Sequence, residues 1–305
     1  MVSWRRVDAS SVILPGMFKR QTTGSVVCAS CGYLVGVNDA TCYNCGRRNP
    51  GLWGFAPALR SLGKDLGFVP FVIGTCVVVY ALSLLASGAA VMSGGLFSFL
   101  SPSGISLLMF GASGRLPVFD LGSWWTLLSA SWLHGSLLHI LFNMLWIRQL
   151  APAVGELYGP GRMVIIYTVA GVTGFLLSSV AGLTMGWLPI RVLQGATMTV
   201  GASAAIFGLL GAAIYYGRRT GSSAVGSQAW NYAVPLFIFG FIIPGIDNYA
   251  HAGGFLGGYL MGMWLDPLKP ERANHMLAAV VCLAVSLLAI GYSVIDYFVR
   301  LRHLI

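Results

Sequence analysis

The sequence is dominated by apolar stretches of about 20 residues, separated by short polar or glycine-rich segments. Such a length suits a helix that crosses a hydrocarbon layer about 30 Å thick. The pattern predicts an all-α polytopic membrane protein, with a long glycine- and serine-rich stretch after its first span. The seven expected spans are residues 68–91, 135–153, 163–183, 201–216, 230–246, 250–266 and 275–299.

Composition supports this prediction and adds an orientation. Only 9% of the residues are charged, against about 25% in an average soluble domain. The basic residues lie in short loops rather than on an aromatic-studded basic surface, so no nucleic-acid partner is expected. Of the 18 Lys and Arg residues, 14 fall on one side of the predicted spans, which predicts a cytoplasmic N-terminus. The other side holds Arg115, Arg191, Arg300 and Arg302.

Four cysteines form two matched C-x-x-C pairs, Cys28 with Cys31 and Cys42 with Cys45. Four thiolates complete the tetrahedral coordination of Zn²⁺. We interpret residues 28–46 as a zinc ribbon whose metal is structural, because two paired knuckles at this spacing are typical of such domains. Two disulfides are the alternative, and they would require an oxidising compartment. The ribbon's partner is left open.

The chain is thus expected to comprise four parts. A tail covers residues 1–27, the ribbon residues 28–46, a basic linker residues 47–66 and a transmembrane domain residues 67–300. Within the fifth span, Pro235 and Pro244 are expected to kink the helix.

Four polar side chains lie near the starts of three predicted spans. His139 and Asn143 are in the second span, Ser203 begins the fourth and His251 begins the sixth. These three spans run in the same direction, so the four side chains share one depth, in the outer half of the membrane. Polar groups at such depth are costly and usually face a protein interior or a wet cavity. Glycines on the His251 face would let the fourth helix approach closely.

This combination indicates acyl transfer. Ser203 would attack a peptide carbonyl, and His251 would take its proton and return it to the leaving amine. The oxyanion needs donors, and the Ser203 amide, Asn143 and His139 are the candidates. Asp247 is a candidate third member, although we expect it in the loop before the sixth span. Taken singly, each polar residue is also explained by helix packing or interhelical hydrogen bonding.

Three motifs in order resemble those of rhomboid intramembrane serine proteases. The stretch SWLHGSLLHILFNMLWI at 131–147 is similar to the family's second transmembrane segment, GASAAIFGLLGA at 201–212 to its nucleophile motif and DNYAHAGGFLGGYLMG at 247–262 to its histidine helix. The resemblance covers roughly residues 66–300. It implies a six-helix core followed by a seventh, C-terminal transmembrane helix.

The resemblance also implies roles and partners. Ser203 corresponds to the nucleophile, His251 to the base, and His139 and Asn143 to the oxyanion stabilisers. Substrates would be single-span membrane proteins cut in or near the lipid bilayer, catalysis would need no cofactor, and the location would be the bacterial inner membrane. Two further positions match supporting residues of the family, His134 in the second segment and Phe207, which would pack on the catalytic histidine.

The sequence departs from the family pattern at two places. Ala204 follows the serine where the family has glycine, and residues 124–126 read Trp-Trp-Thr where many members have a Trp-Arg pair. The alternative function is a rhomboid-like pseudoenzyme that binds transmembrane helices as a scaffold or chaperone. A transporter ranks last, because the middle spans contain no pair of acidic residues.

Overall fold

The computed structural model describes residues 19–29, 31–57, 65–91, 94–190, 193–243, 245–300 and 302. The chain divides into two compact units, residues 1–66 and 67–305. Four of the predicted features therefore lie wholly or partly outside the described residues. These are the first 18 residues of the tail, residues 58–64 of the linker, Arg191 and the kink at Pro244.

The first unit is built on a two-stranded antiparallel sheet. Strand β1 (Ser25–Val27) pairs with β2 (Leu34–Gly36), and Val26 lies opposite Val35. Gly32 and Gly46, each directly after a C-x-x-C pair, have φ of 75° and 71°, a conformation that glycine adopts without strain. The unit's core is very small: it comprises Val26, Cys28, Val35, Val37 and Cys42.

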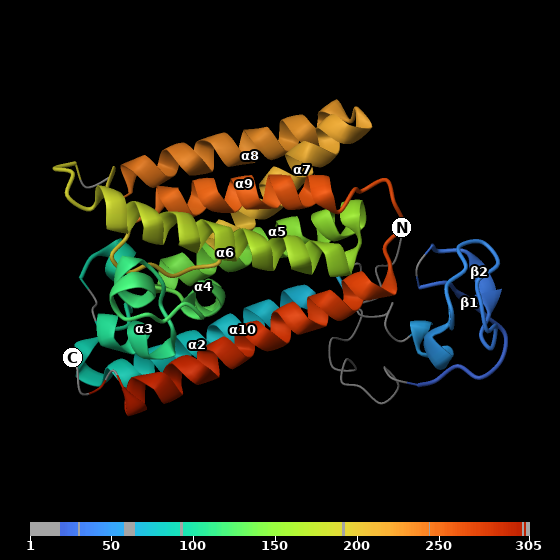
Figure 1. Ribbon diagram of the computed structural model, residues 1–305, viewed down its shortest axis with the longest axis horizontal. Coiled ribbons are helices and arrows are strands. Elements are labelled where there is room, and N and C mark those ends of the chain that lie inside the picture. The colour runs from blue at the N-terminus through green and yellow to red at the C-terminus, as the bar shows by residue number, and fades with distance from the viewer. Residues whose placement is uncertain are drawn as a thin grey trace, which may run out of the picture. The chain divides into compact units, whose positions relative to one another are not determined.

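Among the described residues, the second unit contains seven long helices, which pack into a bundle (Figure 1). Its architecture is that of an all-α polytopic membrane protein. Each predicted span corresponds to one helix, although the fifth helix begins seven residues before the predicted span. The helices are α2 (Phe68–Ser87), α5 (Leu137–Tyr158), α6 (Pro160–Met185), α7 (Ser203–Thr220), α8 (Ser223–Ile242), α9 (Asn248–Trp264) and α10 (Ala273–Val299).

Among the described residues, four helices are long and apolar enough to cross a membrane. They occupy Phe68–Ala90, Leu137–Tyr158, Pro160–Met185 and Asn274–Val299. The other three helices are short or less apolar: α7 ends in a basic turn and α9 has 17 residues. Helix α8 runs through Pro235 without interruption. The crossing of the membrane by all seven helices stays a prediction.

Helix α7 lies at the centre of the bundle. Twelve of its 18 residues are buried, and α6 and α9 pack on it from two sides. Its small side chains explain this position, because Gly208 and Gly211 let neighbouring backbones come into direct contact. Helix α8 is more peripheral, with three buried residues out of 20.

The glycine- and serine-rich stretch at 94–134, here called the first loop, folds into short helices. Among them are α3 (Gly104–Phe110) and α4 (Thr126–Ser129). Part of the loop pairs with the segment that precedes α7: Ser113 and Thr199 form an antiparallel bridge with N···O distances of 3.0 and 2.7 Å. The loop is therefore a folded cap on the end of the bundle where α7 begins.

A buried arginine joins the start of α6 to the turn after α9, at the end of these helices opposite to the start of α7. Arg162, in the first turn of α6, is 3% exposed. Its Nη1 donates to the carbonyl oxygens of Leu265, Asp266 and Lys269 at 2.9–3.0 Å. These carbonyls belong to the turn after α9, so the guanidinium satisfies groups that the helix end leaves free.

Candidate active site

Ser203 and His251 meet in the middle of the helical unit. Ser203 is the first residue of α7, and His251 lies in the first turn of α9. The Ser203 Oγ and the His251 Nε2 are 2.9 Å apart, within hydrogen-bond distance. The imidazole is 6% exposed and the serine half-buried. A hydroxyl and a base at this distance form the arrangement that activates a nucleophile.

Glycine packing brings the two helices to this distance. A Cβ added at Gly254 would lie 2.0 Å from the Ala204 carbonyl oxygen, and one added at Gly258 would lie 2.0 Å from that of Gly208. No side chain fits in such gaps, so the α7 and α9 backbones are in contact. The close approach predicted from the glycines on the His251 face is confirmed.

The His251 ring is held by stacking rather than by an acid. The Phe207 ring lies against it, with centroids 4.3 Å apart and an interplanar angle of 19°, so the expected aromatic contact is confirmed. Asp247 does not bond to the imidazole. Its carboxylate accepts from the Ala250 amide at the start of α9 and from the Ser178 hydroxyl. The His251 Nδ1 is buried without a hydrogen-bond partner among the described residues, so no carboxylate there orients the imidazole.

His139 lies close to the backbone just before the serine. The Gly135 amide donates to its Nδ1 at 3.2 Å, so in the neutral ring Nε2 carries the proton. That Nε2 would be 2.6 Å from a Cβ at Gly201, whose φ is +129°. Position 201 therefore requires glycine both for its backbone conformation and for the space that His139 occupies. The His139 Nε2–H therefore lies beside the turn that precedes Ser203 and is available as a hydrogen-bond donor.

Asn143 is buried on the same face of α5 as His139. Its Nδ2 donates to the His139 carbonyl oxygen at 2.8 Å. One amide proton is thus used within the helix, and the second remains available as a donor.

The Ser203 amide is a further donor of the right kind. As the first residue of α7 it has no carbonyl partner within the helix. The next residue, Ala204, replaces the expected glycine, and its methyl group points at Gly174 of α6. A Cβ built at Gly174 would lie 2.7 Å from the Ala204 Cβ, so the missing side chain of Gly174 leaves the room that the extra methyl needs.

His134 is a buried residue that packs against the His139 ring. The side chain is 1% exposed, and neither ring nitrogen has a hydrogen-bond partner among the described residues. Its ring meets that of His139 edge to face, with centroids 5.1 Å apart. His134 therefore buttresses the His139 ring.

The four ribbon cysteines form a second candidate site, in the first unit. Their sulfur atoms all lie within 4.8 Å of one another. The Sγ atoms of Cys28 and Cys45 are 3.8 Å apart, and those of Cys31 and Cys42 are 3.6 Å apart. Thiolates around one tetrahedral Zn²⁺, with bonds of about 2.3 Å, would be about 3.8 Å apart. The donor set thus fits a metal ion, and none of these four cysteines is joined in one of the alternative disulfides.

The thiols of this cluster differ in acidity. Burial acts to raise the pKa of Cys31, but hydrogen bonds with the Tyr33 backbone, Asn44 and the neighbouring thiols outweigh it and lower the pKa to about 6. Burial raises the pKa of Cys45 to about 12, and its hydrogen bonds with the other thiols act in the same direction. The Cys31 thiol therefore loses its proton more readily than the Cys45 thiol. A bound cation would favour the thiolate form of all four cysteines.

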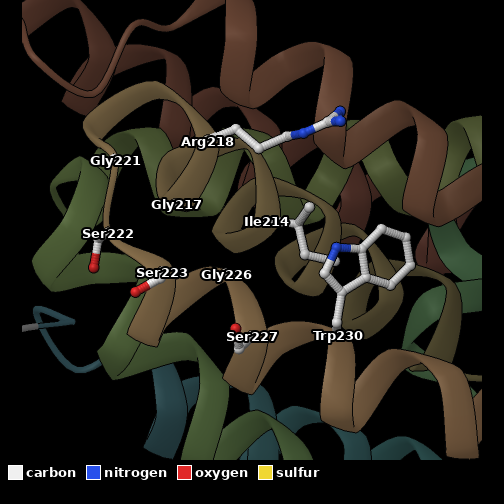
Figure 2. Close-up of a pocket in the computed structure, with 9 residues that line it drawn as sticks. All are labelled: Ile214, Gly217, Arg218, Gly221, Ser222, Ser223, Gly226, Ser227 and Trp230. Carbon is white, nitrogen blue, oxygen red and sulfur yellow. The ribbon is translucent and has the colours of Figure 1, made fainter.

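A cavity of about 310 Å³ lies at the other end of α7, at its turn into α8. Figure 2 shows the Arg218 guanidinium and the Trp230 indole on one side, while the Ser222 and Ser223 hydroxyls point the other way. These polar groups do not converge on one point. Ser203 is the first residue of α7 and the lining residues lie in its second half and beyond, from Ile214 onward, so this cavity is distant from Ser203.

Some contacts of the site had no signal in the sequence. Ser178 holds Asp247, Gly135 sets the tautomer of His139, and Gly174 accommodates Ala204. Each residue type is abundant in this chain, and each contact joins a residue to a partner on another turn or helix. The periodicity of apolar positions could not have identified them.

The helical unit is similar in sequence to known proteins. Residues 121–267 match the family described as Rhomboid domain. Over 191 residues, 61% of this chain, it is 34% identical to the rhomboid protease GluP of Bacillus subtilis and covers 34% of that protein. It is 29% identical to RHOMBOID-like protein 4 and 34% identical to RHOMBOID-like protein 5, both of Arabidopsis thaliana. Those alignments cover 65% and 56% of this chain and 52% and 53% of the relatives. The chain thus spans about half, or less, of the length of these relatives.

Proposed function

We propose, on the premise that residues 121–267 match the Rhomboid domain family, that this chain is an intramembrane serine endopeptidase. The observation that carries the proposal is the 2.9 Å contact between the Ser203 Oγ and the His251 Nε2. Given the similarity to rhomboid proteins, this contact supports catalysis rather than the alternative that Ser203 and His251 serve only in helix packing.

Catalysis would proceed in two steps. In the first, the Ser203 Oγ forms a bond to the scissile carbonyl carbon while the His251 Nε2 takes its proton. The peptide C–N bond then breaks, and the imidazolium returns the proton to the leaving amine. In the second step, His251 deprotonates a water molecule that attacks the acyl-serine, and Ser203 recovers its proton.

The oxyanion of each tetrahedral intermediate would be stabilised by three donors: the Ser203 amide, the His139 Nε2–H and the second amide proton of Asn143. Such prearranged donors contribute the largest single part of many rate enhancements; losing one costs about 100- to 1000-fold in kcat. The tautomer of His139 set by Gly135 supports this assignment. No cofactor takes part in these steps.

Substrates would be single-span membrane proteins. The protein is an integral membrane protein, and we place it in the bacterial inner membrane with its N-terminus in the cytoplasm, because 14 of its 18 Lys and Arg residues fall on that side. The dyad would then lie in the outer half of the bilayer. The cut in a substrate is expected in the outer half of its span.

The test is cleavage of a tagged single-span substrate by purified protein in liposomes. The parent should yield a shortened product whose mass locates the cut, and both Ser203→Ala and His251→Ala should yield none. Ser286→Ala is the matched control, because that hydroxyl only bonds to the Cys282 carbonyl within α10, and it should cleave as the parent does. A serine-directed fluorophosphonate should label the parent at Ser203. Absence of both cleavage and labelling would instead favour the pseudoenzyme scaffold.

We further propose that Cys28, Cys31, Cys42 and Cys45 hold a structural Zn²⁺. The ion would supply the folding energy that the five-residue core cannot, about 10–16 kcal/mol in comparable peptides. The purified chain should contain one zinc by elemental analysis. Removing the ion with a chelator, or substituting Cys42→Ser, should make residues 25–48 sensitive to proteases. Cys282→Ala, a cysteine outside the cluster, should retain the zinc, and a Cys42→Ser variant that keeps it would contradict the assignment.

A further inference from the structure

The last helix of the bundle ends against the first loop. Trp125 donates its indole N–H to the Ser293 Oγ at 3.0 Å. The Trp125 ring also meets Tyr292 edge to face, with centroids 4.5 Å apart. Figure 1 shows the C-terminal end of α10 beside α3, and α10 packs on both α3 and α4. This helix therefore contacts the cap above the dyad, not only the sides of other helices.

An arginine at the end of α10 adds a second attachment. Arg300 donates through Nε and Nη2 to both carboxylate oxygens of Asp296, each at 2.9 Å. With the fork so oriented, its Nη1 donates to the Leu121 carbonyl oxygen at 2.6 Å and its Nη2 to the Ser123 hydroxyl at 3.1 Å. The Asp296 side chain is 9% exposed and that of Arg300 is 41% exposed, so water is excluded mainly from the carboxylate of this pair.

The first loop in turn holds the segment that precedes Ser203. Besides the Ser113–Thr199 bridge, the Arg115 amide donates to the Ala196 carbonyl and the Leu116 amide to that of Thr197, both at 3.0 Å. The Gly201 amide donates to the Ala130 carbonyl at 2.9 Å. The loop thus reaches within two residues of the nucleophile.

We propose that Trp125, Ser293, Asp296 and Arg300 form a brace that positions the nucleophile. The brace anchors the first loop to α10, and the loop holds Gly201, which sets the entry of Ser203 into α7. Arg300 and Trp125 are positioning residues rather than catalytic ones. Only the kinetic consequence of this proposal, the effect on reaction at Ser203, rests on the proposed protease function.

The test compares three substitutions with a matched control. Arg300→Gln removes the cation and the fork, Arg300→Lys keeps the charge without the planar fork, and Trp125→Phe keeps the ring without its donor. Arg302→Gln is the control, because Arg302 is exposed and has no hydrogen bond or ion pair to another described residue. Two quantities are measured for each variant: the rate of fluorophosphonate labelling at Ser203, and amide hydrogen exchange over residues 111–131 and 193–203.

We expect Arg300→Gln to slow labelling about tenfold, because a shift well below 1 Å at the nucleophile already reduces rates noticeably. Arg300→Lys and Trp125→Phe should each slow it about threefold, and Arg302→Gln should match the parent. Exchange should accelerate over both segments and stay unchanged at residues 155–162, where the buried Arg162 contacts lie. A purely structural loss would instead raise exchange throughout the bundle.

Two results would overturn the brace. One is unchanged exchange at residues 111–131 in Arg300→Gln. The other is faster exchange there with an unchanged labelling rate, which would separate the loop from the nucleophile. If the parent itself neither cleaves nor labels, the proposed protease function fails, and the exchange at residues 193–203 still decides whether the brace holds that segment.

Discussion

Helices α7 and α8 both pack on α9, but in opposite ways. The α7 backbone touches that of α9 along glycines, and two-thirds of α7 is buried. Helix α8 buries three small residues and turns large apolar side chains outward. The exposed set is Trp230, Val234, Ile238, Phe239, Phe241 and Ile242. The α7–α9 interface is thus fixed by backbone contact, whereas α8 touches α9 at few points and packs mainly on α7.

The difference indicates which helices hold Ser203 and His251 in place and which helix could move. A hydrogen bond of 2.9 Å between two helices tolerates little movement, and backbone contact at Gly208, Gly254 and Gly258 prevents such movement. In the proposed protease, a substrate helix would still have to reach Ser203 and His251 from the lipid. Helix α8 buries only three of its residues and has little contact with α9, and we infer that substrate enters beside it.

The largest effect is expected where the tight interface is broken. Gly258→Ala places a Cβ 2.0 Å from the Gly208 carbonyl oxygen, so α7 and α9 must separate. Cleavage should fall at least about 100-fold, since a misplacement of 1 Å can cost that much, and the free energy of unfolding should fall by about 3 kcal/mol. Cleavage kinetics and thermal melting measure the two effects. Gly74→Ala, whose added methyl meets nothing within 4 Å, should change neither.

A smaller loss is expected from Gly201→Ala. The methyl would lie 2.6 Å from the His139 Nε2, at a φ of +129°, and such strain costs about 1–3 kcal/mol. Displacement of His139 should lower kcat about 30-fold with little change in KM. The control is Gly221→Ala, which imposes a positive φ of 73° with nothing within 4 Å of its methyl. Equal losses in the two variants would show that strain alone, not His139, is responsible.

The weakest effect is expected from tethering α8, and it separates access from chemistry. Tyr232 of α8 accepts a hydrogen bond from Gln149 of α5 at 3.1 Å and meets the Trp146 ring edge to face. Cysteines at 149 and 232, joined by a bifunctional maleimide, should slow cleavage of a transmembrane substrate about tenfold while fluorophosphonate labelling stays at the parent rate. Full cleavage after complete cross-linking would contradict entry beside α8.

Much of this organisation was predictable from the sequence, for identifiable reasons. Apolar runs report the burial of whole helices, so each predicted span has a helix at its position. The start of α8 was placed too late, because its first turns contain Ser223, Ser227 and Gln228, which an apolar count excludes. The pairing of Ser203 with His251 followed from shared depth and from small residues at helical spacing, two properties that sequence order preserves.

Contacts of the first loop could not be predicted in the same way. The Arg300 bonds join residues separated by 177 and 179 positions, and nothing in a periodic pattern connects such segments. The same holds for the pairing of Ser113 with Thr199. The sequence indicated that residues 92–134 form no simple span, but the folded form of this stretch depends on partners elsewhere in the chain.

The packing of Ala204 against Gly174 has a consequence for how this sequence can change over time. A Cβ at 174 would lie 2.7 Å from the Ala204 Cβ, but it would also lie 2.5 Å from the Ala250 carbonyl oxygen. Glycine is thus required at 174 whichever residue follows the serine. The backbone of α9 therefore keeps open the space that an alanine at 204 occupies, and a change from glycine to alanine there needs no compensating mutation.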